Sequence, residues 1–141
     1  MTSLVAVVTG GNKGIGLGIT NLLKENNYKV ITCGRSHLSQ QNSIDGVDFI
    51  KGDASIYETH EKLAKKAINS YGRLDLYVNN VGLSEWKEIK NIDNKFLDKI
   101  FKTNIYSVFW GCKVAEEYLS KNGSIINISS IASKRGTKNN S

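Results

Sequence analysis

The 141-residue sequence predicts a doubly wound α/β fold, in which helices cover both faces of a parallel β-sheet. Two observations support this prediction. Short runs of β-branched and apolar residues alternate with longer helical patterns along the chain, and a glycine-rich octet follows the first run. We expect one domain over residues 1–141, because no linker or internal repeat divides the sequence.

The expected strands are short and largely apolar, and each ends where glycine or polar residues begin. They lie at residues 4–8, 28–33, 47–50, 74–78 and 124–128. Strands separated by helices indicate right-handed βαβ crossovers, which place all strands parallel.

Three helical segments separate these strands. The first extends from the glycine octet to about residue 27, and the second from an N-cap at Ser55 to Gly72. The third covers about residues 93–119. Residues 133–141 are polar and without pattern, so we expect a loop there.

The composition is that of a globular chain, with 40% hydrophobic and 23% charged residues. No apolar run approaches the roughly 20 residues that span a bilayer, and the N-terminus is typical of a strand rather than a signal peptide. We therefore expect a cytoplasmic protein without membrane contact. Cys33 and Cys112 have no metal-ligand spacing, so we expect half-buried or buried thiols and no metal site.

The net charge is +6, from 19 basic and 13 acidic residues. A nucleic acid would attract such a chain. The lysines are spread along the whole sequence, however, which favours solvated helix surfaces. We expect no nucleic-acid partner.

The glycine-rich octet, residues 9–16, reads TGGNKGIG and lies between the first strand and the first helix. A tight turn alone would use similar residues. The order strand, loop and helix favours a Rossmann-type dinucleotide loop, in which glycines allow close approach to the pyrophosphate at the helix N-terminus. The residues predicted to bind the cofactor here are Gly10, Asn12, Lys13, Gly14, Ile15 and Gly16.

The end of the second strand indicates which dinucleotide binds. An NAD site places a carboxylate about 20 residues after the loop, at the end of the second strand. Here residues 33–37 of that region contain none, and no carboxylate follows until Asp45. Arg35, followed by Ser36, is placed to meet a 2′-phosphate, and Lys13 adds a second cation. Both cations are otherwise ordinary surface residues. The sequence predicts NADP(H).

These motifs together resemble the classical short-chain dehydrogenase/reductases over the whole chain. Each motif is weak alone, but their shared register is specific. The matching residues are the octet at 9–16, Asp53 after the third strand, NNVG at 79–82, Asn104 in the long helix and INISS at 126–130.

The resemblance implies further cofactor contacts. Asp53 and the backbone of Ala54 would bind the adenine ring, although an aspartate there also caps a helix. Asn80, Val81 and Gly82 would line the cofactor floor. The family usually has alanine at the position of Val81. The larger valine would narrow the space near the nicotinamide ribose.

The resemblance also implies catalytic residues. Ser130 would bind the substrate carbonyl oxygen, with Ser129 as the alternative. Asn104 would hold a water of the proton relay. An amide in an apolar helix needs a polar partner in any case, so a structural role for Asn104 stays open.

The family's proton donor is a tyrosine followed four residues later by a lysine, which lowers the tyrosine pKa. The tyrosine is expected about thirteen residues after the serine, beyond residue 141. No tyrosine in the sequence has a lysine four residues on; these tyrosines are Tyr28, Tyr57, Tyr71, Tyr77, Tyr106 and Tyr118. We expect this chain alone to be inactive, and a complementary C-terminal polypeptide to supply the pair and cover an exposed apolar edge strand at 124–128.

The expected function is therefore an NADP(H)-dependent oxidoreductase that interconverts a small ketone or aldehyde with its alcohol. The loop at 83–86 would border the substrate. The resemblance implies a homo-oligomer built through the long helix. The alternative is a catalytically inactive NADP(H)-binding sensor or interaction module.

Overall fold

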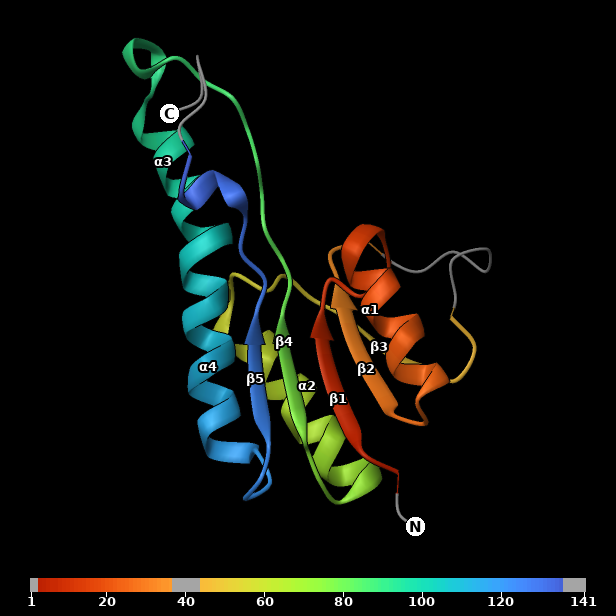
Figure 1. Ribbon diagram of the computed structural model, residues 1–141. Coiled ribbons are helices and arrows are strands. Elements are labelled where there is room, and N and C mark those ends of the chain that lie inside the picture. The colour runs from red at the N-terminus through yellow and green to blue at the C-terminus, as the bar shows by residue number, and fades with distance from the viewer. Residues whose placement is uncertain (1–2, 37–43, 136–141) are drawn as a thin grey trace.

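The computed structural model describes residues 3–36 and 44–135, and within them five parallel strands form one sheet (Figure 1). The spatial order of the strands is β3-β2-β1-β4-β5. The strands are β1 (Val5–Thr9), β2 (Lys29–Gly34), β3 (Val47–Lys51), β4 (Leu76–Asn79) and β5 (Ser124–Asn127). The predicted doubly wound fold is confirmed.

Helices lie on both faces of the sheet. α1 (Gly14–Glu25) packs on one face against β1 and β2, while α2 (Tyr57–Tyr71) and α4 (Ser107–Tyr118) pack on the other. α3 (Asn94–Phe101) belongs to a segment that rises beyond the carboxyl ends of the strands (Figure 1). Because both faces are covered, the inner strands are largely apolar on both sides.

The predicted N-cap at Ser55 is wrong. α2 begins at Tyr57, with Ile56 in the N-cap position and no side-chain cap. The cause is a turn that precedes the helix, in which the backbone N–H of Ser55 donates to Asp53 Oδ1 at 2.9 Å. The N–H of Ile56 donates to the Asp53 carbonyl at 3.1 Å, so the chain enters the helix later than expected.

The predicted long helix is present but not uniform. Asp93 caps α3 by accepting the N–H of Phe96 at 2.7 Å. Between α3 and α4 lies a π-helical turn, η3 (Lys102–Tyr106), which contains Asn104. A π turn holds an additional residue per turn and so re-aims one side chain, which amphipathic periodicity does not reveal.

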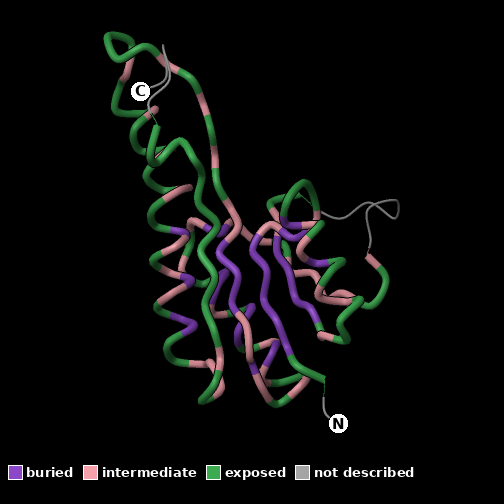
Figure 2. Tube along the Cα trace, viewed as in Figure 1, coloured by how far each residue is buried: buried purple, intermediate pink, exposed green. Residues whose placement is uncertain are grey.

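β5 is the open edge of the sheet. All five residues of β1 are buried, whereas all four residues of β5 are exposed. Figure 2 shows this contrast as the purple inner strands beside the green outer one. Ile125, Ile126 and Ile128 keep 39%, 46% and 38% of their surface exposed, as the sequence predicts for an uncovered edge.

None of the helices in residues 3–36 and 44–135 has the length and apolar run that crossing a bilayer requires. After β5 the described chain forms a short 3-10 helix, η4 (Ile131–Ser133). The rest of the loop predicted at 133–141 lies outside the described residues from residue 136 on.

Candidate functional site

Almost all predicted site residues directly follow the carboxyl ends of the strands, so they lie at the same end of the sheet (Figure 1). In an open α/β sheet, ligands bind at this end, where neighbouring connections leave toward opposite faces. That condition holds between β1 and β4. The residues are Gly10, Asn12, Lys13, Gly14, Ile15 and Gly16 after β1; Arg35 and Ser36 after β2; Asp53 and Ala54 after β3; Asn80, Val81 and Gly82 after β4; and Ser130 after β5.

The glycine loop has the backbone that only glycine adopts easily. Gly10 and Gly14 have φ values of +66° and +54°. A Cβ on Gly16 would lie 2.3 Å from the Gly10 carbonyl oxygen, so α1 packs against the loop without room for any side chain. Around Gly14 a Cβ would meet nothing within 4 Å, which leaves the N-terminus of α1 open toward a ligand.

Neighbouring strands hold this loop in place. From β2, Thr32 Oγ1 accepts the N–H of Gly11 at 2.7 Å and donates to the Val8 carbonyl at 2.7 Å. After β4, Asn80 Nδ2 donates to the Thr9 carbonyl at 2.9 Å. The Asn80 backbone N–H donates to Thr9 Oγ1 at 3.0 Å. Hydrogen bonds from β2 and from the segment after β4 therefore hold the loop from both sides.

Val81 stands where the family usually has alanine, and the structure shows how it fits. A Cβ on Gly10 would lie 2.9 Å from Val81 Cγ2, so the valine occupies space that the glycine leaves free. The N–H of Val81 also donates to Thr9 Oγ1 at 3.2 Å. The larger side chain therefore packs against the loop.

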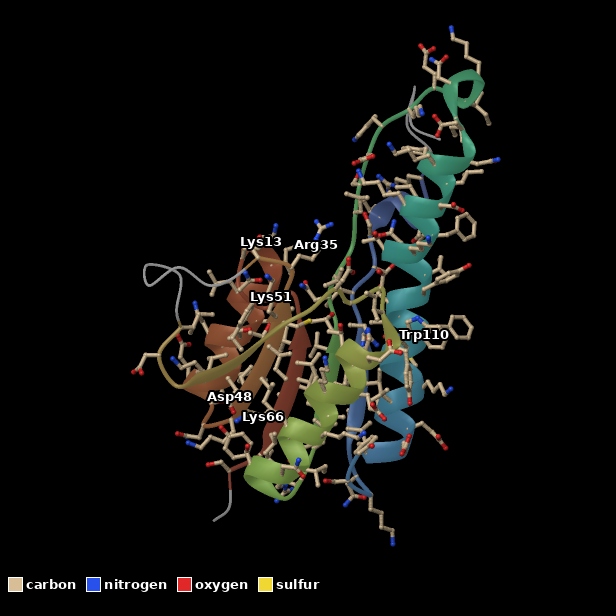
Figure 3. All side chains as sticks on the ribbon, turned by 180° about the vertical axis from the view of Figure 1, so that it is seen from behind. Lys13, Arg35, Asp48, Lys51, Lys66 and Trp110 are labelled. Atoms are coloured by element: carbon tan, nitrogen blue, oxygen red, sulfur yellow. The ribbon has the colours of Figure 1, made fainter. Side chains whose placement is uncertain are left out.

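Cations gather beside the loop. Lys13 is the exposed N-cap residue of α1, and Arg35 and Ser36 are exposed after β2. Lys51 pairs in register with Gly34, the residue before Arg35. Figure 3 shows Lys13, Arg35 and Lys51 toward the same end of the sheet. In the described part of the chain no carboxylate pairs with these three cations, and residues 26–44 contain no acidic residue.

Asn12 completes this side of the loop. Its side chain lies against Gly34, where a Cβ would be 3.0 Å from Asn12 Oδ1. Ile15, by contrast, is 70% exposed and points its apolar side chain into solvent at the start of α1. Its predicted role is through the backbone N–H, which exposure of the side chain leaves unaffected.

Asp53 and Ala54 form the turn after β3. Asp53 is half-buried, and its Oδ1 accepts the N–H of Ser55, which ties one carboxylate oxygen to the turn. Asp53 therefore caps a turn ahead of α2 rather than the helix itself. Oδ2 makes no hydrogen bond within the described residues, which leaves an acceptor for a ligand.

Together these residues fit a dinucleotide. The loop glycines form a cradle that a Cβ would fill at Gly10 and Gly16. The first turn of α1 carries no acidic residue that would repel a pyrophosphate. Cations and a carboxylate acceptor lie on the β2 and β3 side, where the adenosine half of a Rossmann-bound dinucleotide sits.

Asn104 makes the polar contacts that an amide in an apolar helix requires. Its Nδ2 donates to the Leu83 carbonyl at 2.9 Å, and its Oδ1 accepts the Leu83 N–H at 2.7 Å. It also lies beside Gly82, where a Cβ would be 3.6 Å from Oδ1. The amide therefore ties η3 to the loop after β4.

Ser130 lies at the exposed end of β5, apart from the packed nucleotide loop. Its Oγ accepts the N–H of Ala132 at 3.2 Å and so caps η4. Within the described residues this hydroxyl donates no hydrogen bond. Ser129 is exposed as well and carries no side-chain contact within the described residues.

Sequence reasoning missed Thr32 and Lys51. Thr32 is a fully buried polar residue in an apolar strand, and that pattern is the signal that could have identified it. Lys51 is recognisable only once β3 is aligned with β2.

The described His, Cys, Asp and Glu side chains form no cluster that could hold a metal ion.

Comparisons with known proteins agree with this geometry. A family model described as short chain dehydrogenase matches residues 4–141. An uncharacterized oxidoreductase of Methylorubrum extorquens is 33% identical over 135 residues, which cover 90% of this chain and 54% of that protein. (+)-Borneol dehydrogenase 2 of Salvia officinalis is 32% identical, covering 94% of this chain and 50% of the enzyme.

A solved structure is similar as well. The ligand-free aldohexose dehydrogenase of Thermoplasma acidophilum aligns with a TM-score of 0.88 at 26% identity, over 98% of this chain and 53% of that one. The chain thus spans about half the length of each of these proteins.

Proposed function

Because the chain belongs to the short chain dehydrogenases, we propose that it is the nucleotide-binding part of an NADP(H)-dependent oxidoreductase. The observation that carries the cofactor choice is the cationic side of the glycine loop. Among the described residues, no carboxylate forms an ion pair with Lys13 or Arg35 there. A guanidinium binds a 2′-phosphate through two parallel hydrogen bonds, whereas a carboxylate would bind the ribose hydroxyls of NAD.

The bound nicotinamide supplies or accepts the hydride that interconverts a carbonyl with its alcohol. The residues of this chain bind and orient the cofactor and the substrate. Ser130 donates a hydrogen bond from its hydroxyl to the substrate oxygen, which stabilises the negative charge that develops there. Asn104 keeps the loop after β4 in place and, by family resemblance, helps to hold a water of the proton relay.

The substrate class that we propose is a small ketone or aldehyde, or the corresponding alcohol. Two of the similar proteins are named as dehydrogenases of borneol and of aldohexoses, and both names denote chemistry at a carbon that bears a hydroxyl group. Cys33 and Cys112 are free thiols, which fits the reducing cytoplasm that we propose as the compartment.

We further propose that additional polypeptide covers β5 and supplies the tyrosine and lysine of the proton relay. The support is the edge itself, because an exposed apolar strand offers unpaired backbone groups for a further strand. On α4 and the turn before it, Ile105, Tyr106 and Phe109 are 45%, 46% and 70% exposed. This apolar face supports a homo-oligomer of the completed unit.

The cofactor proposal is tested by binding. Wild-type protein should bind NADPH more tightly than NADH, as measured by fluorescence of the reduced nicotinamide. Arg35→Asp should weaken NADPH binding at least tenfold, since it replaces an ion pair worth roughly 1.5–3 kcal/mol with repulsion. The control is Lys66→Met. Lys66 Nζ lies 3.5 Å from Asp48 Oδ2, and this ion pair is remote from the glycine loop (Figure 3). Tighter binding of NADH by the wild type would contradict the proposal.

The proposal of additional polypeptide is tested by mass and turnover. Mass spectrometry and size-exclusion chromatography of the purified protein should show more polypeptide than this chain alone. A folded, monomeric species with only this chain's mass would contradict it. NADPH absorbance with a panel of carbonyl substrates then separates the two functions, since tight binding without turnover in the complete protein would favour a sensor.

A further inference from the structure

His60 is a fully buried imidazole in α2 whose two nitrogens both have partners. Its Nδ1 lies 2.8 Å from the hydroxyl of Tyr77 on β4, which is also fully buried. Its Nε2 lies 2.6 Å from the carbonyl oxygen of Ala54. The two rings are stacked, with centroids 6.0 Å apart and planes inclined by 22°.

These contacts define where the proton sits. A carbonyl oxygen only accepts, so His60 Nε2 carries the hydrogen and donates it to Ala54. Nδ1 then accepts from the Tyr77 hydroxyl. Burial lowers the pKa of His60 and raises that of Tyr77 well above its ordinary value, so both groups are neutral and the direction of the chain is fixed.

The hydrogen bond from His60 holds one side of the peptide group between Ala54 and Ser55. The other side is held by Asp53, whose Oδ1 accepts the N–H of Ser55 at 2.9 Å. The carbonyl and the N–H of one rigid peptide plane therefore connect His60 with the Asp53 carboxylate. Rotation of this plane would turn the carboxylate as well.

We propose that His60 is a positioning residue that orients the Asp53 carboxylate toward the adenine amino group through the Ala54–Ser55 peptide. The inference rests on the proposed function, in which Asp53 binds adenine. Core packing alone does not require this arrangement, because an apolar side chain would fill the same volume without holding the Ala54 carbonyl. A buried Ala54 carbonyl without a hydrogen-bond donor would destabilise the fold, or the Ala54–Ser55 peptide plane would rotate to find another donor.

The test compares two ligands that differ at the edge of the base that Asp53 would bind. NADPH carries the adenine amino group, a hydrogen-bond donor, whereas its hypoxanthine analogue, deamino-NADPH, carries a carbonyl oxygen there and a hydrogen on the adjacent N1. Dissociation constants are measured on the complete protein by nicotinamide fluorescence. Wild type should prefer NADPH about tenfold, the effect of one hydrogen bond to a charged group. If the protein prefers NAD, then NADH and deamino-NADH replace the pair.

Three variants test whether the preference for NADPH over deamino-NADPH depends on His60. His60→Leu should bind both ligands equally, because the peptide is no longer held. His60→Gln keeps an N–H donor near the place of Nε2 and should retain the preference. Tyr77→Phe is the matched control in the same buried cluster, since it leaves the bond to Ala54 intact and should also retain it. A general structural defect would weaken both ligands alike.

The proposal is overturned if His60→Leu keeps the preference for the amino group, or if wild type has none. Should His60→Leu fail to fold, the ¹⁵N chemical shifts of His60 in the wild type decide, because the neutral tautomer with its proton on Nδ1 and none on Nε2 would exclude donation to Ala54. A wild type that binds neither NADPH nor NADH would contradict the proposed function instead.

Discussion

The two halves of the sheet differ in how completely they are packed. β1 and its neighbour β2 lie between helices, and the glycine loop that follows β1 is braced by Thr32 and Asn80. β5, which leads to Ser130, is exposed throughout. The predicted cofactor residues therefore lie on the packed half of the sheet, whereas Ser130 follows the exposed strand. If the proposed function holds, nucleotide binding should depend on the first half and turnover on what covers β5.

The largest expected effect tests this contrast with the same substitution on both strands. Ile31→Ala in β2 should cost about 2–5 kcal/mol of unfolding free energy, because the side chain is fully buried. Ile126→Ala in β5 should cost less than about 1 kcal/mol, since that isoleucine is 46% exposed. Urea unfolding of the chain measures both. Equal losses would mean that β5 is covered in solution, and the contrast would disappear.

The next effect concerns the glycine loop. Gly16→Ala should abolish NADPH binding and cost about 1–3 kcal/mol, because the new Cβ would lie 2.3 Å from the Gly10 oxygen and 2.5 Å from Asn80 Nδ2. Thermal unfolding and nucleotide titration measure the two consequences.

Gly18 provides the control for this substitution, because a Cβ there meets nothing within 4 Å. Gly18→Ala should keep nucleotide binding and stabilise α1 by about 0.5–1 kcal/mol. Similar losses of binding in both variants would show that α1 tolerates no change, rather than that the loop is tightly packed.

A smaller effect is expected at the opposite end of the sheet. Asp75 accepts the Val5 N–H at 2.9 Å and two bonds from Arg73, each of 2.7 Å. Partial burial raises the pKa of Asp75, but the hydrogen bonds from Arg73 and Val5 outweigh it and lower the pKa overall. Asp75→Asn should cost about 1–2 kcal/mol at neutral pH without affecting nucleotide binding.

The pH dependence gives this prediction its sign. A carboxyl with a lowered folded-state pKa stabilises the fold above its unfolded pKa of about 4 and loses that contribution as pH falls further. Wild type should therefore lose more stability than Asp75→Asn below about pH 4. Parallel curves would exclude the ion pair as the cause.

The smallest effect at neutral pH comes from His60. Burial lowers the pKa of His60 in the folded state. At a pH between the two pKa values the unfolded chain is therefore protonated at His60, whereas the folded chain is not. Wild-type stability should fall as pH drops below about 6.5, by at most about 1.4 kcal/mol per pH unit. His60→Gln should lack this slope. Unfolding midpoints measured from pH 7.5 to 5 in both proteins provide the comparison, and an unchanged slope would contradict it.

Local chemistry was sufficient to predict the strands and the glycine loop. Strand alternation and loop composition are short-range properties, so residues 9–16 already predict a glycine turn between β1 and α1. The exposed edge at β5 was predicted from the resemblance, because the sheet of that family continues past the fifth strand, and the exposure of β5 confirms it.

Tertiary packing decided what no local pattern contains. The π turn at η3 exists where Asn104 reaches the backbone of Leu83, a partner 21 residues away. α2 starts after Ser55 because Asp53 takes that residue's N–H. The line from Tyr77 through His60 to Ala54 joins a strand, a helix and a loop. Hydrogen bonds between distant segments form only after the chain has folded, so the individual sequence patterns carry no record of them.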